Sequence, residues 1–183
     1  MRWLALALVA ACGGHPVDPV PVAPVAAPVA TGPSVYDLPL ALTAADGTAI
    51  ALDVDRGHTT LISMFYGTCP AACPMLVEAI GRALDQAPPD VRVLLVSFDP
   101  VRDTPAALRD IARRRHLDGR WTLAAAADLD ARTLAAVLGI RYRATANGQF
   151  FHTSAIVALD ADGRMLGRMD GLGDPAPLVA ALR

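Results

Sequence analysis

The chain has 183 residues, of which 54% are hydrophobic, and its formal net charge is -2. All 16 basic residues are arginine, which excludes chemistry that needs a lysine, such as Schiff-base formation or a Walker phosphate-binding loop. The near-neutral charge and the lack of a dense basic run give no reason to expect a nucleic-acid partner.

The N-terminus has the features of an export signal. Arg2 is followed by an apolar segment, residues 3–11, which is too short to span a bilayer. Small residues precede Cys12, so residues 1–12 resemble a bacterial lipoprotein signal in which Cys12 becomes the acylated first residue of the mature protein. The alternatives are ordinary signal cleavage and a buried apolar start with an incidental cysteine. An odd cysteine in an exported protein favours lipidation.

Residues 13–34 are dominated by proline, valine and alanine. Repeated proline favours an extended, polyproline-like path, which predicts a semi-rigid linker that holds a globular domain away from a membrane. The predicted organisation is therefore a signal at 1–12, a linker at 13–34 and one domain at 35–183. We expect a monomer, anchored in the membrane and facing the periplasm or another extracytoplasmic space.

From about Val35 the pattern changes to alternating strands and helices. Apolar runs, helical spacing and turn residues predict the following elements in chain order: a hairpin of 40–42 and 50–52, a strand at 59–65, a helix at 71–87, a strand at 91–98, a helix at 104–116, a strand at 121–123, a helix at 130–138, a hairpin of 154–159 and 165–169, and a helix from 174 to the end.

Strands that alternate with helices in this way indicate β-α-β units with a parallel portion that is buried on both faces. The order β-α-β-α-β-α-β-β-α, with a cysteine motif between the first long strand and its helix, is the thioredoxin-like arrangement. We therefore expect an α/β fold with a central mixed sheet flanked by helices and with an N-terminal β-hairpin.

Cys69 and Cys73 are separated by three residues, between the predicted strand at 59–65 and the body of the next helix. Cys73 is expected in the first turn of that helix, where free N–H groups and the helix dipole stabilise a thiolate. Thiolates attack disulfides and bind soft metals such as copper(I), and this spacing, wider than that of thioredoxin, permits either role. A structural disulfide would close a very short loop and would stabilise the fold little.

A third metal ligand would have to be a histidine from elsewhere in the fold. His58 is predicted in an exposed loop, and His116 at a helix end, where a cation interacts favourably with the dipole. His152 lies just before the predicted strand at 154–159, and in a thioredoxin-like fold that loop faces the cysteine loop. On the residues alone, His152 is either a metal ligand or an ordinary packed or exposed histidine.

Three ordered motifs resemble the Sco/SenC family of membrane-tethered, thioredoxin-like proteins, which handle copper for the dinuclear copper centre of cytochrome c oxidase. The family motif Cys-Pro-x-x-Cys-Pro corresponds to residues 69–74, and Val-Ser-x-Asp-Pro-x-Arg-Asp-Thr corresponds to residues 96–104. The family's histidine before a Ser-containing strand, followed by Asp-Gly, corresponds to His152 and residues 162–163. The resemblance extends from about Val35 to the end of the chain.

The resemblance implies that copper, as Cu(I) or Cu(II), is held by Cys69, Cys73 and His152. It also implies that Asp99 lies near the site and influences the metal or the protonation of the thiols without necessarily coordinating. The implied partner is the copper-site subunit of a respiratory oxidase, or another copper protein, and the implied attachment to the membrane is through a lipid on Cys12.

Two positions depart from the family pattern. Phe151 stands where family members often have an aspartate, so the imidazole of His152 lacks a carboxylate to orient it. Ala71 stands where an aspartate is frequent, which removes a charge beside the thiolates. Both departures bear on the affinity for copper and are compatible with a different client.

A second function is compatible with the same residues. In a thiol–disulfide reductase, Cys69 or Cys73 attacks a disulfide of an extracytoplasmic client and the other cysteine resolves the mixed disulfide. This role needs no histidine, so the sequence leaves enzymatic activity open. A peroxidase is disfavoured because Thr68 directly precedes Cys69 and no Thr-x-x-Cys arrangement is present. A structural zinc site would need a fourth strong ligand.

Overall fold

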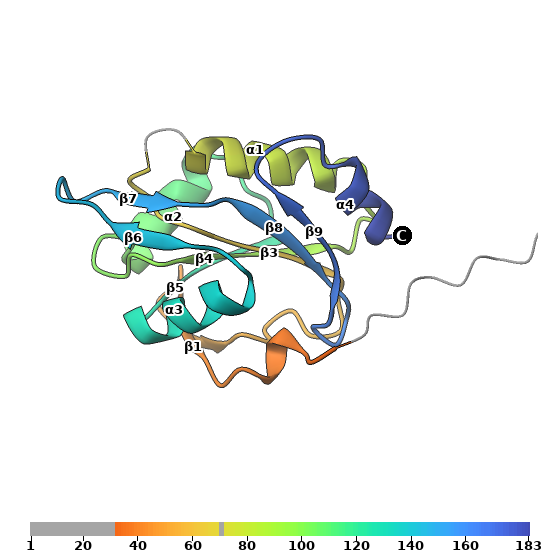
Figure 1. Cartoon of the computed structure of the whole chain (residues 1–183), viewed down its shortest axis with the longest axis horizontal. Helices are drawn as coiled ribbons and strands as arrows, with labels where there is room; N and C mark the ends of the chain where they lie inside the picture. The colour runs from red at the N-terminus through yellow and green to blue at the C-terminus, as the bar shows by residue number, and fades with distance from the viewer. Residues whose placement is uncertain (1–31, 70–71) are drawn as a thin grey trace, which may run out of the picture.

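The computed structural model describes residues 32–69 and 72–183, which form a central mixed sheet with helices on both faces (Figure 1). The sheet has seven strands in the order β2-β1-β5-β4-β3-β8-β9. These strands are β1 Ala41–Ala44, β2 Ala49–Ala51, β3 Thr60–Phe65, β4 Arg92–Ser97, β5 Trp121–Ala126, β8 Ala155–Leu159 and β9 Met165–Asp170. The helices are α1 Ala72–Leu84, α2 Pro105–Arg114, α3 Asp128–Val137 and α4 Ala176–Ala181, and a short 3-10 helix, η1 Val35–Asp37, precedes β1. The predicted thioredoxin-like class, with its N-terminal hairpin, is confirmed.

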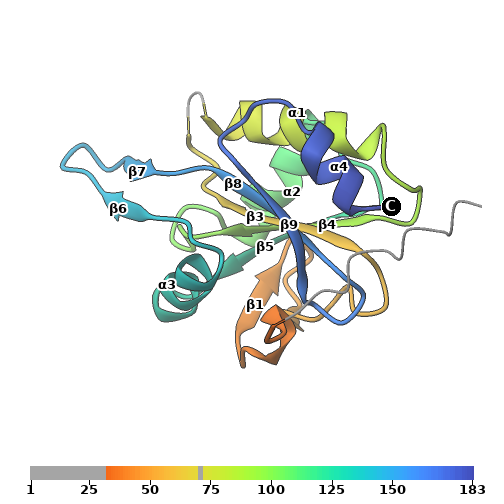
Figure 2. The same cartoon turned by 45° about the vertical axis from the view of Figure 1, so that its right-hand side comes forward.

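The helices form two layers on the sheet. α1, α2 and α4 cover one face, and α3 lies on the opposite face (Figures 1 and 2). β3, β4 and β5 are parallel and follow one another across the sheet, so right-handed crossovers place α1 and α2 on the same side. The groove between these two helices therefore opens beside the loop that joins β3 to α1.

The central strands are buried on both faces, as their continuous apolar runs predicted. Every residue of β3 and of β8 is buried, because helices cover both sides of this part of the sheet. α1 turns its apolar positions towards the sheet, where Leu76, Ala79 and Ile80 are fully buried. This packing fixes the helix whose first turn carries Cys73.

The predicted helices at 71–87, 104–116 and 174 to the end are each shorter in the structure, and two further elements differ in extent for reasons that the fold supplies. β5 continues beyond the predicted strand through the alanines at 124–126. Alanine favours a helix in isolation, but these residues pair with β1 on one side and β4 on the other, so tertiary pairing overrides the local preference. α3 begins at Asp128, two residues earlier than predicted, with Asp128 and Asp130 in its first turn, where acidic groups are favourable.

The sequence did not predict a second, two-stranded sheet. β6 Tyr142–Ala144 and β7 Phe150–His152 form an antiparallel hairpin that projects from the body of the fold (Figure 2). Each strand has only three residues, too few to show the alternation by which a strand is recognised in a sequence. This hairpin takes the place of the predicted loop before β8 and carries His152 at its end.

The topology brings three segments to one edge of the sheet. β3 and β4 are parallel, so the loops that follow Phe65 and Ser97 leave the sheet at the same end. β8 is antiparallel to β3, so the segment that precedes Ala155 arrives at that end as well. The cysteine loop, the loop after β4 and the end of β7 therefore meet.

The predicted signal at 1–12, its lipidation site Cys12 and most of the predicted linker lie outside the described residues. These three assignments stay predictions. Over residues 32–69 and 72–183, no helix is long and apolar enough to cross a membrane.

Candidate metal centre

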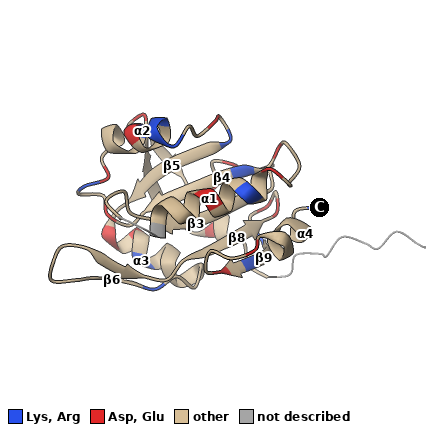
Figure 3. Ribbon diagram, turned by 90° about the horizontal axis from the view of Figure 1, so that it is seen from above, with Lys and Arg blue, Asp and Glu red and all other residues tan. Residues whose placement is uncertain are grey.

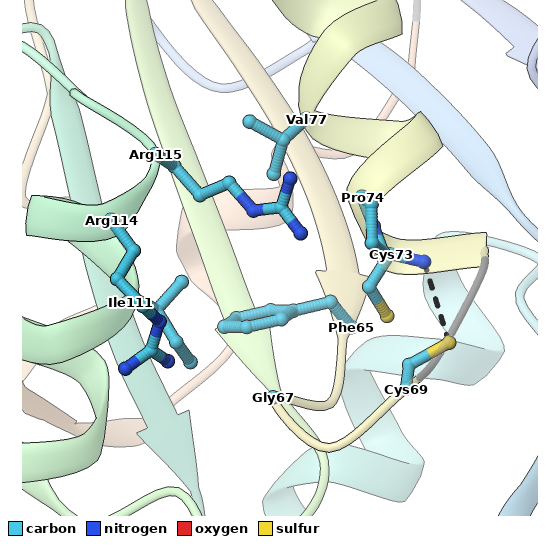
Figure 4. Close-up of a pocket in the computed structure, with 9 residues that line it drawn as sticks. All are labelled: Phe65, Gly67, Cys69, Cys73, Pro74, Val77, Ile111, Arg114 and Arg115. Carbon is cyan, nitrogen blue, oxygen red and sulfur yellow. Dashed lines mark hydrogen bonds between the residues drawn. The ribbon is translucent and has the colours of Figure 1, made fainter.

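Cys69 lies in the loop after β3, and Cys73 lies in the first turn of α1 (Figure 4). The backbone N–H of Cys69 donates to the carbonyl oxygen of Tyr66 at 3.2 Å, which turns the loop back over the end of the strand. The backbone N–H of Cys73 donates to the Sγ atom of Cys69 at 3.4 Å (Figure 4). Both cysteines are present as thiols rather than as a disulfide, with the sulfur atoms facing a common space.

The third member of the cluster is His152, at the end of β7. One ligand atom each from Cys69, Cys73 and His152 lies within 4.8 Å of the other two. This distance allows one ion to contact all three after small side-chain adjustments. The predicted juxtaposition of an imidazole with the two sulfurs is therefore observed, whereas the ligand roles of the three residues stay predictions. His58 and His116 are not members of this cluster.

A backbone carbonyl orients the imidazole of His152. Its Nδ1 atom lies 3.3 Å from the carbonyl oxygen of Thr153, and a proton on Nδ1 that donates to this oxygen leaves the lone pair of Nε2 for a metal. Phe151 plays no such part, because its ring is 58% exposed and lies beneath the guanidinium group of Arg143. The missing family carboxylate is thus replaced by a main-chain group, which the sequence could not reveal.

Aromatic rings enclose the histidine on the side of the hairpin. Tyr66 meets the imidazole edge to face and Phe98 meets it at a tilt, each with ring centroids 5.6 Å from that of His152. Tyr66 also donates through its hydroxyl group to Gln149 Oε1 at 3.1 Å, which ties the cysteine loop to the hairpin. Phe150 packs between them, 5.2 Å from both Tyr66 and Phe98. This packing restrains the ring and excludes water from one side of the cluster.

The two cysteines differ in their surroundings. Cys73 is 6% exposed, and burial, with a further contribution from neighbouring Cys69, raises the pKa of its thiol far above the ordinary value. Burial at Cys73 therefore opposes the thiolate that the helix N-terminus was expected to favour. Cys69 is only partly buried, and its sulfur accepts the N–H of Cys73.

Asp99 is not a member of the cluster of sulfur and nitrogen atoms, and it directly follows Phe98, whose ring contacts His152. The side chain of Asp99 is buried and forms an ion pair with the Nε atom of Arg102. The same arginine donates through Nη1 to the carbonyl oxygen of Gly148, in the turn between β6 and β7, and its guanidinium group lies 5.5 Å from the centre of the Phe150 ring. The pair of Asp99 and Arg102 therefore connects the loop after β4 to the hairpin that carries His152, and the predicted influence of Asp99 on the site stays a prediction.

Asp103 is a supporting residue that the sequence did not identify. Asp103 and Thr104 both precede α2, and Thr104 caps the helix by accepting the Ala107 N–H at 3.4 Å. Asp103 instead is buried and accepts hydrogen bonds from the Gly67 N–H and the Ser97 hydroxyl. Burial raises the pKa of its carboxyl group. A capping position and a buried brace look alike in a sequence, so only the fold distinguishes them.

The donor set selects a soft metal. Two thiolates and one imidazole suit copper, and Cu(I) accepts two or three ligands without further coordination. Within the described residues the cluster has three members, one fewer than a structural zinc site uses. The residues therefore fit copper, as the sequence predicted.

The fold and the cluster together define a class: thioredoxin-like proteins that combine a Cys-x-x-x-Cys pair with a distant histidine. Residues 29–183 match the SCO1/SenC family, and the chain belongs to this family. An SCO2-like protein of Rickettsia typhi is 33% identical over 64 residues, a match that covers 33% of this chain and 32% of that relative. The chain thus spans about a third of the length of this curated relative.

Solved structures of similar proteins support the fold. ScoI of Bradyrhizobium japonicum, solved with copper bound, is 25% identical, with a TM-score of 0.59 over 79% of this chain and 95% of that chain. A SCO1/SenC family lipoprotein of Bacillus anthracis is 18% identical, with a TM-score of 0.69 over 78% of this chain and 92% of that chain.

Proposed function

We propose that this protein carries one copper ion on Cys69, Cys73 and His152 and delivers it to a client protein. The observation that supports this proposal is the gathering of one imidazole and two sulfur ligand atoms within 4.8 Å of one another. The three proposed ligands are soft donors and lie at the edge of the sheet. This arrangement suits a metal ion that the protein must release again. A copper-bound relative of the same family is consistent with this assignment.

The unequal burial of the ligands suits transfer. Cys73 is buried in the first turn of α1, whereas Cys69 is partly exposed on a loop. A thiolate of a client can approach the metal beside Cys69 and displace it first, while Cys73 and His152 still hold the ion. Copper then passes by ligand exchange, with no free ion in solution and no change in its oxidation state.

The client that we propose is the copper-site subunit of a respiratory oxidase, which the resemblance to the Sco/SenC family implies. The same proposal places the protein outside the cytoplasm as a monomer, tethered through a lipid on Cys12. The lipoprotein from Bacillus anthracis supports the tether by similarity, and mass spectrometry of the membrane fraction tests it. An acylated Cys12 as the first residue is expected, whereas an intact residue 1 would contradict the tether.

Copper titration of the reduced full chain tests the metal site. We expect one equivalent to bind, and the Cu(II) form to show an absorption band from thiolate-to-copper charge transfer. Cys69→Ser and Cys73→Ser should each abolish the band, and His152→Ala should weaken copper binding by at least about tenfold. His58→Ala, which removes a histidine outside the cluster, is the matched control and should bind as the parent does. Unchanged binding by His152→Ala would refute the ligand role of His152.

A second candidate function, reduction of a client disulfide, rests on the pairing of an accessible sulfur with a buried one. Cys69 attacks one sulfur of the client disulfide and releases the other as a thiolate. Cys73 then attacks Cys69, which forms the Cys69–Cys73 disulfide and releases the second client thiol, so two electrons pass to the client. His152→Ala separates the two functions, because it should spare disulfide exchange while weakening copper binding.

A further inference from the structure

A pocket between α1 and the end of α2 opens onto the two cysteines, and His152 is not among its lining residues. Its volume is about 60 Å³, and its lining includes Cys69, Cys73, Arg114 and Arg115 but no residue of β6 or β7. Figure 4 shows the guanidinium group of Arg115 extended towards α1, above the ring of Phe65. The two cysteines thus belong both to the cluster with His152 and to the lining of this arginine-bordered pocket.

The charge of the pocket lining is unbalanced. Arg114 and Arg115 are its charged members, and the lining contains no acidic residue. Among the described residues, the side chain of Arg115 has no hydrogen-bond or ion-pair partner. Arg114 has only a long contact of 3.9 Å with Asp110, and its side chain is 67% exposed. Two cations that border a hollow with no acidic residue in its lining favour an anion there.

The end of α2 fixes the positions of both arginines. The backbone N–H of Leu117 donates to the carbonyl oxygen of Ala112 at 3.0 Å, and the backbone N–H of His116 donates to the carbonyl oxygen of Arg113 at 3.2 Å. With His116 at a positive φ of 52°, these bonds form a Schellman motif that ends the helix. The backbone that carries Arg114 and Arg115 is therefore held in place, while their side chains stay available to a ligand.

A longer groove continues from the pocket. Its volume is about 410 Å³, it runs between α1 and the segment after α2, and it shares Val77, Arg114 and Arg115 with the pocket. This groove also contains acidic side chains, of which Asp118 is paired with Arg120 at 2.8 Å. Figure 3 shows the mixture of acidic and basic positions along α2 and its surroundings. The end of the groove beside the cysteines is thus the part suited to an anion.

We propose that this pocket binds an acidic side chain of the client polypeptide that accepts the copper. The volume of about 60 Å³ exceeds what one water molecule needs and suits the carboxylate group of Asp or Glu. The groove beyond accommodates the neighbouring peptide. A carboxylate held by Arg114 and Arg115 places the adjacent client residues directly over Cys69 and Cys73, so the pocket selects clients with an acidic residue beside their thiols.

The inference rests on the proposed copper-carrier function, and it specifies the transfer step. Two client thiols lose their protons and bind Cu(I), while the Cu–S bonds to Cys69 and Cys73 and the Cu–N bond to His152 break. The protons pass through solvent to the two cysteine thiolates, and copper stays in the +1 state. Atoms and charge balance without an oxidant or reductant.

Two peptides that differ at a single residue test whether this pocket binds an acidic side chain. One short, amidated peptide carries two cysteines with a glutamate between them, and its twin carries glutamine in place of the glutamate. Copper-loaded full-length chain is mixed with each peptide at low ionic strength, and the rate of Cu(I) transfer is measured. We expect the parent chain to transfer copper about three- to tenfold faster to the glutamate peptide, the size of one or two partly exposed charge pairs. The double variant Arg114→Gln, Arg115→Gln should transfer to both peptides at equal rates.

Arg113→Gln is the matched control, because it removes the same charge from the same helix outside the pocket. It should keep the preference for glutamate. Equal rates for the parent chain, or a preference that survives the double variant, would overturn the pocket assignment. Copper loading of every chain is measured beforehand. A parent chain that binds no copper would refute the proposed function, whereas normal loading without a peptide preference would refute only the pocket.

Discussion

The backbone N–H of Gly67 donates a hydrogen bond of 2.8 Å to the buried carboxylate of Asp103. This bond joins the loop that carries Cys69 to the segment that begins α2. The Ser97 hydroxyl donates to the same carboxylate oxygen, so a single side chain braces the ends of β3 and β4. The position of the cysteine loop thus depends on a residue that is not itself a member of the metal cluster.

Replacement of Gly67 by alanine should destabilise the fold. A Cβ atom at this position would lie 2.4 Å from Asp103 Oδ1 and 2.7 Å from Ile111 Cδ1, and such overpacking costs about 1–3 kcal/mol. Urea unfolding measures the difference. Gly81→Ala is the control, because a Cβ there meets nothing within 4 Å and alanine is the better helix former by about 1 kcal/mol. Equal stability of Gly67→Ala and the parent would contradict the close approach.

The free energy of unfolding should depend on pH through Asp103. Burial raises the pKa of Asp103 in the folded state, so the folded chain holds this proton more tightly than the unfolded chain does. The resulting stability is fully present below the unfolded pKa, about 4, and is lost as the pH rises through the folded pKa. Relative to the parent, Asp103→Asn should therefore gain stability as the pH rises from about 4 towards neutrality. A difference that is constant over this range would show that Asp103 does not titrate as described.

Loss of Arg102 should loosen the hairpin that carries His152. Arg102→Ala removes the contacts to Asp99 and to the Gly148 carbonyl oxygen. We expect faster amide hydrogen exchange in β6 and β7, and copper binding weaker by about tenfold, the effect typical of residues that orient a ligand. Arg143→Ala on the same hairpin removes only the contact with the exposed Phe151 ring and should change neither quantity. Unaltered amide hydrogen exchange in Arg102→Ala would show that this arginine does not support the site.

The two cysteines should react at different rates. Cys73 is buried and burial raises the pKa of its thiol, whereas Cys69 is partly exposed. In the reduced chain at mildly alkaline pH, iodoacetamide should therefore modify Cys69 about tenfold faster or more. Peptide mapping by mass spectrometry follows both sites, and Cys69→Ser shows the rate of Cys73 alone. Comparable rates in the parent chain would argue against the unequal burial.

His116→Gly should stabilise the protein. His116 adopts a φ of 52° at the end of α2, a conformation that glycine reaches without the steric penalty of a Cβ atom. The gain should be about 0.5–1 kcal/mol by urea unfolding. His116→Ala keeps the Cβ atom and should give no such gain, so equal effects of the two substitutions would point to the imidazole instead of the backbone.

The sequence by itself determined the fold class and the chemistry. Apolar runs such as Leu61–Phe65 have one stable environment, the middle of a sheet covered on both faces, and the helix after Cys73 follows from its apolar spacing. Two cysteines three residues apart can hold a soft metal or form a disulfide whatever surrounds them. These properties are local, so they can be recognised from the amino-acid sequence. The hairpin of β6 and β7 was missed because three-residue strands carry no readable period.

Only the tertiary structure decided which groups meet. Antiparallel pairing of β8 with β3 brings His152 to residues far away in the chain, and the same edge receives Arg102 and Asp103 from the loop after β4. Burial at Cys73 opposes the thiolate that a helix N-terminus favours, and burial depends on the whole packed domain. Contacts between distant segments, and the loss of water that accompanies them, are properties of the three-dimensional fold, and no local pattern encodes them.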